Sequence, residues 1–160
     1  MSKALFFMIA IGVAIGLAWP SGEPSVTARS GTMASAAPDE RRETTLEREG
    51  NGHFYTHAKV NGELMRFIVD TGASVVALTV EDAERLGITV DPATFAVVGE
   101  GASGPIRGKD LILDSVDIDG KRVTNVRAVV LEGSRLSLLG QSYLSRMGEV
   151  QMKGDYMVLK

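Results

Sequence analysis

The chain has 160 residues and a formal net charge of −3, with 44% hydrophobic and 23% charged residues. This composition is ordinary for one globular domain with accessory segments. Lysine and arginine are scattered, which argues against a nucleic-acid partner, and the absence of cysteine excludes disulfides and thiolate metal sites.

The first 20 residues contain an apolar segment. Ala4–Trp19 carries no charged residue, and its length lies between that of a membrane-spanning helix and that of a signal-peptide core. Because Lys3 favours a cytosolic amino terminus, we expect residues 1–20 to form a membrane anchor that places the following chain outside the cytosol. One alternative is a signal segment that is cleaved after Gly16-Leu17-Ala18, and another is a chain that stays soluble in the cytosol.

Residues 21–50 have the composition of a linker. Serine, threonine, alanine, glutamate, arginine and proline dominate, and the apolar residues show no period. We therefore expect a flexible tether that leads into a folded domain over residues 51–160.

The folded domain is predicted to consist mostly of short strands. His53–Val60 and Glu63–Val69 flank Asn61-Gly62, a dipeptide typical of two-residue hairpin turns. Thr79 starts a helix signal that ends at Gly87. Further strands are expected at 75–78, 95–98, 106–117, 123–131, 150–152 and 156–159, with turns at Asp119-Gly120 and Gly154-Asp155 and a second short helix at 141–147. This pattern predicts an all-β fold, either a small barrel or a sandwich.

A glycine-rich segment lies between two of the predicted strands. Gly99, Gly101 and Gly104 match the dinucleotide-binding fingerprint in spacing, but that fingerprint requires a helix directly afterwards. A strand-like stretch from Ile106 follows instead. We therefore predict a hairpin that is either a plain loop or a lid over a site, formed by Gly99, Glu100, Gly101, Ala102, Ser103 and Gly104.

The two histidines, His53 and His57, could share a metal ion only on a helix. On a strand, where we place them, they lie about 13 Å apart at roughly 3.3 Å per residue, too far for one ion. We therefore predict no metal site and no cofactor, and we expect both side chains to be exposed.

One carboxylate stands between two apolar segments. Phe67-Ile68-Val69 precedes Asp70-Thr71-Gly72, and Val75–Leu78 follows. In a polar loop this tripeptide would be explained by an Asx-type turn. Between buried strands the carboxylate would be poorly solvated, which makes Asp70 a functional candidate. Gly72 allows close backbone approach, and Thr71 supplies a hydroxyl that can lock the loop.

Three segments, in this order, resemble retropepsin-like aspartic proteases. They are Phe67–Ser74, which reads FIVDTGAS, the glycine-rich Gly99–Gly104, and Leu138-Leu139-Gly140 ahead of a helix. The resemblance covers about residues 51–160 and is strongest to the bacterial membrane-anchored branch. It implies a closed barrel or half-lobe with one or two short helices that acts as a homodimer. It also implies an inner-membrane location with the protease domain in the periplasm.

The resemblance assigns the site residues. Asp70 would be catalytic, with loop support from Thr71, Gly72, Ala73 and Ser74: Thr71 would brace the opposing loop, and Gly72 would let the two loops meet. Gly99–Gly104 would be a flap over an extended peptide, made more polar than retroviral flaps by Glu100 and Ser103. Leu138-Leu139-Gly140 would be a structural motif.

An aspartic protease needs two carboxylates that share a proton, and this chain has one Asp-Thr-Gly. Asp114-Ser115-Val116 lacks the glycine, Asp119-Gly120 lies in a predicted turn, and Asp91-Pro92 lies in a predicted loop. The second carboxylate should therefore be Asp70 of another copy, across a two-fold axis. The resemblance implies the same, with chain ends paired into a shared sheet to which Tyr156–Leu159 would contribute.

The expected function is an aspartic endopeptidase that acts on protein or peptide substrates. One alternative is a catalytically silent retropepsin-like module for binding or assembly at the bacterial membrane. Another is a β-barrel that binds lipid or peptidoglycan and carries Asp-Thr-Gly by accident. An intact Asp70-Thr71-Gly72 favours the enzyme, because a silent module has no need of a buried charge.

Overall fold

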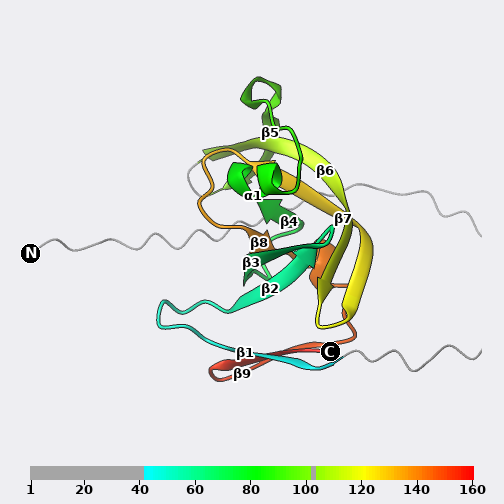
Figure 1. Cartoon of the computed structure of the whole chain (residues 1–160). Coiled ribbons are helices and arrows are strands. Elements are labelled where there is room, and N and C mark those ends of the chain that lie inside the picture. The colour runs from blue at the N-terminus through cyan, green and yellow to red at the C-terminus, as the bar shows by residue number, and fades with distance from the viewer. Residues whose placement is uncertain (1–41, 102–103) are drawn as a thin grey trace, which may run out of the picture.

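The computed structural model describes residues 42–101 and 104–160, which form ten strands, two short α-helices and one 3₁₀-helix (Figure 1). The predicted anchor at residues 1–20 and residues 21–41 of the predicted linker lie outside the described residues. Every helix among the described residues falls short of the length and apolar character needed to cross a membrane.

The larger sheet has seven strands and closes into a barrel. A pairing of β2 with β6, in addition to the pairings along the sheet, joins its two sides. The predicted all-β fold is therefore confirmed. In spatial order the strands are β2 (Tyr55–Val60), β3 (Glu63–Val69), β8 (Leu138–Leu139), β4 (Val76–Leu78), β7 (Lys121–Leu131), β6 (Gly104–Ile118) and β5 (Ala96–Gly101).

A second sheet of three strands lies below the barrel in Figure 1. Its strands are β1 (Thr44–Glu47), β10 (Tyr156–Leu159) and β9 (Val150–Lys153), with β10 in the middle. Strand β1 lies inside the range 21–50 predicted as a linker, so the folded region includes Thr44–Glu47, ahead of residue 51. Burial alternates along β1, but four residues with a single large apolar side chain, Leu46, give too short a pattern to recognise in sequence.

The central position of β10 also changes one expectation. Both of its edges are paired within the chain, to β1 and to β9. Within the single chain, Tyr156–Leu159 therefore has no free edge for a sheet shared with a second chain.

All three predicted turns are present, and in two of them the geometry explains the sequence. Asn61 and Gly62 both have positive φ, 49° and 98°, and Asp119 and Gly120 have φ of 49° and 85°. Two-residue hairpin turns with positive φ at both positions match the twist of the flanking strands. Asparagine, aspartate and glycine tolerate that conformation better than other residues, so these dipeptides determine the registers of β2–β3 and β6–β7.

The first helix, α1 (Val80–Arg85), begins where the capping signal predicts. The Thr79 hydroxyl accepts a hydrogen bond from the Asp82 amide at 3.0 Å, which satisfies one of the free amides of the first turn. A 3₁₀-helix, η1 (Pro92–Thr94), follows in the predicted loop before β5.

The second helix is shorter than predicted. Helix α2 covers Gln141–Leu144, whereas the sequence pattern predicts a helix over 141–147. Beyond Leu144 the turn tightens, and the Gly148 amide bonds to the Lys160 carbonyl at 2.9 Å. The long-range contact with the end of the chain therefore ends the helix early.

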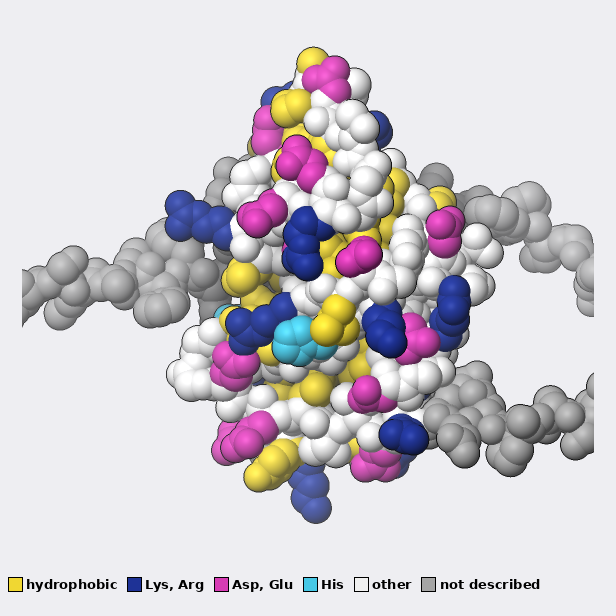
Figure 2. Space-filling model, viewed as in Figure 1, with side chains coloured by type: hydrophobic (Ala, Val, Ile, Leu, Met, Phe, Trp, Pro, Cys, Tyr) yellow, Lys and Arg dark blue, Asp and Glu magenta, His cyan; other side chains and the backbone are white. Residues whose placement is uncertain are grey.

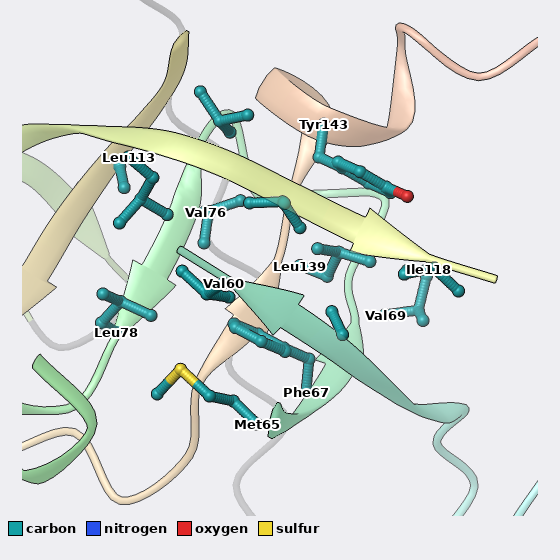
Figure 3. Close-up of a cluster of buried hydrophobic side chains, with 14 of the residues drawn as sticks. Val60, Met65, Phe67, Val69, Val76, Leu78, Leu113, Ile118, Leu139 and Tyr143 are labelled. Carbon is teal, nitrogen blue, oxygen red and sulfur yellow. The ribbon is translucent and has the colours of Figure 1, made fainter. Parts of the chain in front are cut away.

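The barrel interior holds the core, which Figure 3 shows as apolar side chains from several strands pointing toward one another. Tyr143 reaches this core from α2, is fully buried, and donates its hydroxyl to the Lys121 carbonyl at 2.7 Å. Burial raises the pKa of Tyr143 above its ordinary value, so the phenol remains a hydrogen-bond donor. The labelled core residues are Val60, Met65, Phe67, Val69, Val76, Leu78, Leu113, Ile118, Leu139 and Tyr143.

Candidate active site

Asp70 directly follows strand β3, which carries the buried run Phe67-Ile68-Val69. Strand β8 pairs with β3 in parallel, so Leu139 lies beside Val69. The Asp70 amide then bonds to the Leu139 carbonyl at 3.1 Å. Two segments that are distant in the sequence therefore place Asp70 at one end of the barrel strands.

The loop after Asp70 curls back onto the carboxylate. The Gly72 amide donates to Asp70 Oδ1 at 2.9 Å, and a β-carbon at Gly72 would lie 3.3 Å from that oxygen. The flanking strands are buried as expected, and Ala73 is buried too, but Asp70 is half-buried and Thr71 and Gly72 are exposed. The loop leaves the core because it turns at the end of the barrel, so its carboxylate reaches the surface of the single chain.

Gly140 presses against this loop. A β-carbon there would lie 2.2 Å from the Val75 carbonyl oxygen and 2.7 Å from that of Ala73. The next two amides bond to loop carbonyls, Gln141 to Ala73 at 2.8 Å and Ser142 to Ser74 at 3.1 Å. The start of α2 is therefore joined to the Asp70 loop by main-chain contacts that a side chain at Gly140 would prevent.

Two residues of this junction are absent from the sequence-based prediction of the site. The Gln141 side-chain amide donates to the Thr71 carbonyl at 2.8 Å. The Ser142 hydroxyl accepts from the Val76 amide at 3.0 Å and donates to the Arg127 carbonyl at 2.7 Å. The only sequence signal for their role is their position: they are two polar residues at the start of a predicted helix, directly after Leu138-Leu139-Gly140.

The predicted flap is a hairpin between β5 and β6, in which Glu100 pairs with Pro105 and Gly101 with Gly104. A strand of 15 residues, not a helix, begins at Gly104, so the segment lacks the geometry of a dinucleotide site. Gly99, Glu100 and Gly101 belong to β5 and Gly104 to β6, whereas Ala102 and Ser103 lie outside the described residues.

Other surface features do not coincide with this loop. Two hollows border helix α1; both are lined in part by Asp82 and Arg135, and Asp70 lines neither. His53 and His57 are exposed, as expected. Figure 2 shows basic and acidic side chains interspersed over the face in view. The Asp70 loop is therefore the candidate active site because of its chemistry, not because it forms a deep pocket in one chain.

Known proteins are similar to this chain in sequence and in fold. An aspartyl protease family model matches residues 56–143, more than half of the chain. The crystal structure of a retropepsin-like aspartic protease from Rickettsia conorii aligns with a TM-score of 0.62 at 36% identity, covering 74% of this chain and 89% of that one.

Two curated relatives have no assigned activity. An uncharacterised protein in the cobV 5′ region of Sinorhizobium sp. is 37% identical over 75% of this chain and 52% of its own length. An uncharacterised protein of Rickettsia prowazekii (strain Madrid E) is 38% identical over 73% of this chain and 51% of its own length. The chain therefore spans about half the length of the curated relatives it matches.

The family match includes both the Asp70 loop and the Leu138-Leu139-Gly140 segment, which the fold brings together. The structural likeness to the Rickettsia conorii protease covers 74% of this chain. The chain belongs to the aspartyl protease family and is a retropepsin-like member of it.

Proposed function

We propose that this protein is an aspartic endopeptidase whose active site contains two Asp70 carboxylates, one from each protomer of a homodimer. The observation that carries this proposal is the position of Asp70. Its carboxylate accepts a hydrogen bond from the Gly72 amide. The loop that carries it lies at the surface directly after a buried strand, and the fold resembles that of a retropepsin-like protease.

The proposed reaction needs both carboxylates because they divide the work. Two such groups in close contact cannot both ionise easily, so together they hold one proton. The ionised member takes a proton from a water molecule, which attacks the peptide carbonyl. The protonated member donates to the carbonyl oxygen and stabilises the tetrahedral intermediate.

The exposure of the loop supports a shared site. Thr71 and Gly72 are exposed in the single chain, and Asp70 is half-buried, so a second copy could reach all three. The chain contains one Asp-Thr-Gly, and a two-fold axis would supply its duplicate. Thr71 would then brace the partner's loop, and Gly72 would provide the clearance between them.

An extended peptide is the proposed substrate class. In the β5–β6 hairpin Gly101 pairs with Gly104, and neither residue has a side chain of its own to shield its backbone. A peptide bound in extended form could add hydrogen bonds to such a backbone, as in strand addition. We also propose that residues 1–20 hold the enzyme in the bacterial inner membrane with its catalytic domain in the periplasm, because the segment is apolar and follows Lys3.

The first test is Asp70→Asn, which keeps the size of the side chain and its acceptor oxygen but removes the ionisable group. We expect cleavage of a peptide library, followed by mass spectrometry, to fall to background. Thermal unfolding and dimer mass should match the wild type. Asp114→Asn, an exposed position on β6, is the matched control and should retain activity.

The same variant tests whether the site is shared. An excess of Asp70→Asn protein, mixed with a constant amount of wild type under conditions of subunit exchange, should suppress cleavage because mixed dimers contain one carboxylate. Undiminished activity would contradict a shared site. A wild-type dimer that binds peptides and cleaves none of them between pH 3 and 8 would favour the silent binding module instead.

A further inference from the structure

The side chain of Gln141 contacts the active-site loop independently of its backbone. Its main-chain amide donates to the Ala73 carbonyl at 2.8 Å, and its side-chain Nε2 donates to the Thr71 carbonyl at 2.8 Å. Because a carbonyl oxygen can only accept, the nitrogen of the side-chain amide must face Thr71. Gln141 therefore holds the loop at two points, the carbonyls of Thr71 and Ala73.

The Thr71 carbonyl belongs to the same peptide group as the Gly72 amide. That amide donates to Asp70 Oδ1 at 2.9 Å. Since a peptide group is planar, fixing the direction of its carbonyl also fixes the direction of its N–H. A continuous path of hydrogen bonds therefore runs from Gln141, through one rigid peptide group, to the carboxylate.

This peptide group needs an external restraint. Thr71 and Gly72 are both exposed, and glycine allows backbone rotations that other residues resist. The Gln141 side chain opposes rotation of the group. It also polarises the carbonyl, which strengthens the donor on the other side.

We propose that Gln141 is a positioning residue, whose side-chain amide orients the Thr71–Gly72 peptide so that its N–H faces the Asp70 carboxylate. The catalytic consequence rests on the proposed protease function, whereas the orientation of the peptide does not. The fold does not depend on this side chain, because Gly140 packing and the amides of Gln141 and Ser142 already join α2 to the loop.

Two substitutions separate the donor from the shape of the side chain. Gln141→Met keeps the number of side-chain atoms along the chain but removes the donor. Gln141→Arg restores an N–H, because arginine Nε is as many bonds from Cα as glutamine Nε2. Glutamine, methionine and arginine have similar helix propensities. Ser145→Ala serves as the matched control. It removes a hydroxyl at the end of α2 that donates to the Gln141 main-chain carbonyl and does not touch the Gln141 side chain.

We expect kcat of Gln141→Met to fall about 10- to 100-fold, the size of effect that a small misplacement of a reacting group produces. KM should change by less than about twofold, since the substrate contacts remain. Gln141→Arg should recover most of the loss, and Ser145→Ala should behave as wild type. A purely structural contribution would instead lower the melting temperature and impair both Gln141 variants alike.

A second readout requires no activity. The Gly72 amide proton resonance, measured by ¹H–¹⁵N NMR, should move upfield in Gln141→Met, as a weakened hydrogen bond requires, and return in Gln141→Arg. If the wild-type protein cleaves nothing, the protease proposal fails, and this resonance still decides the inference about Gln141. An unmoved Gly72 resonance in Gln141→Met overturns that inference, as does equal loss of kcat in the Met and Arg variants.

Discussion

At the scale of single residues, the geometry of the candidate site depends on glycine at a close contact as well as on Asp70. Gly140 is the clearest case, because a β-carbon there would overlap the Val75 and Ala73 carbonyls. Gly72 has more space, since a β-carbon there would have Asp70 Oδ1 as its nearest neighbour, at 3.3 Å. The two glycines therefore differ: Gly140 is required for α2 and the loop to meet.

We expect Gly140→Ala to lower the free energy of unfolding by about 1–3 kcal/mol or more, because the added methyl must displace main-chain atoms. Urea unfolding measures this loss. Gly50→Ala is the matched control, since a β-carbon at Gly50 would meet nothing within 4 Å. Equal stability of the two variants would show that the loop adjusts to the methyl group without cost.

At the scale of elements, a buried lysine attaches β1 to the barrel. Lys121 is 1% exposed, and its ammonium donates to the Thr44 hydroxyl at 2.7 Å and to the Arg42 carbonyl. Thr44 in turn donates to Asp119 at 2.5 Å. Burial lowers the pKa of Lys121 from its ordinary value of 10.5, despite the opposing influence of Asp119. This network accounts for a strand that the amino-acid pattern of β1 alone did not indicate.

The lowered pKa of Lys121 predicts a pH-dependent stability. Between the folded-state pKa and 10.5 the unfolded chain binds more protons than the folded chain, so the free energy of unfolding rises with pH in that window. Below the folded-state pKa, the cost of burying the charge is fully present. Lys121→Met lacks this titration, so the stability of the wild type minus that of the variant should increase as pH rises toward 10.5.

Urea unfolding of both proteins at several pH values measures this difference in stability. The contributions of titrating groups that both proteins contain cancel in it. Lys59→Met, at an exposed position on β2, controls for the loss of one positive charge. A difference that stays constant, or that decreases with pH, would contradict the direction given for Lys121.

At the scale of the whole molecule, the barrel and the small sheet leave different surfaces open. The pairing of β2 with β6 closes the barrel, and β5, at the end of the strand order, is paired on one side only, to β6. In the three-stranded sheet β10 is central and β1 and β9 form the edges. A partner chain that extends this sheet must therefore pair with β1 or β9. Exposed strand edges are the usual sites of such pairing.

The proposed membrane anchor is tested on the full chain. After cell fractionation and alkaline extraction, we expect the 160-residue protein to stay with the inner membrane and to retain residues 1–20 by mass spectrometry. A version that lacks residues 1–20 should remain in the soluble fraction. A membrane-free protein whose mass matches cleavage after Ala18 would favour the signal-segment alternative.

Much of the fold follows from local physics that the sequence shows directly. Asn61-Gly62 and Asp119-Gly120 specify tight turns through their backbone preferences, and the Thr79 cap specifies the start of α1. Apolar patterns located most strands of the barrel. The Asp70-Thr71-Gly72 motif and the later Leu138-Leu139-Gly140 indicated the family because each is contiguous in the chain.

The sequence by itself thus determined the all-β class, the hairpins and the catalytic candidate. Only the tertiary structure decided that Thr44–Glu47 forms a strand of the fold and that Gln141 reaches Thr71. It also decided that β10 has both edges paired and that the Asp70 loop reaches the surface. The reason is physical: turns and caps depend on neighbouring residues, whereas these four features depend on contacts between segments that are far apart along the chain.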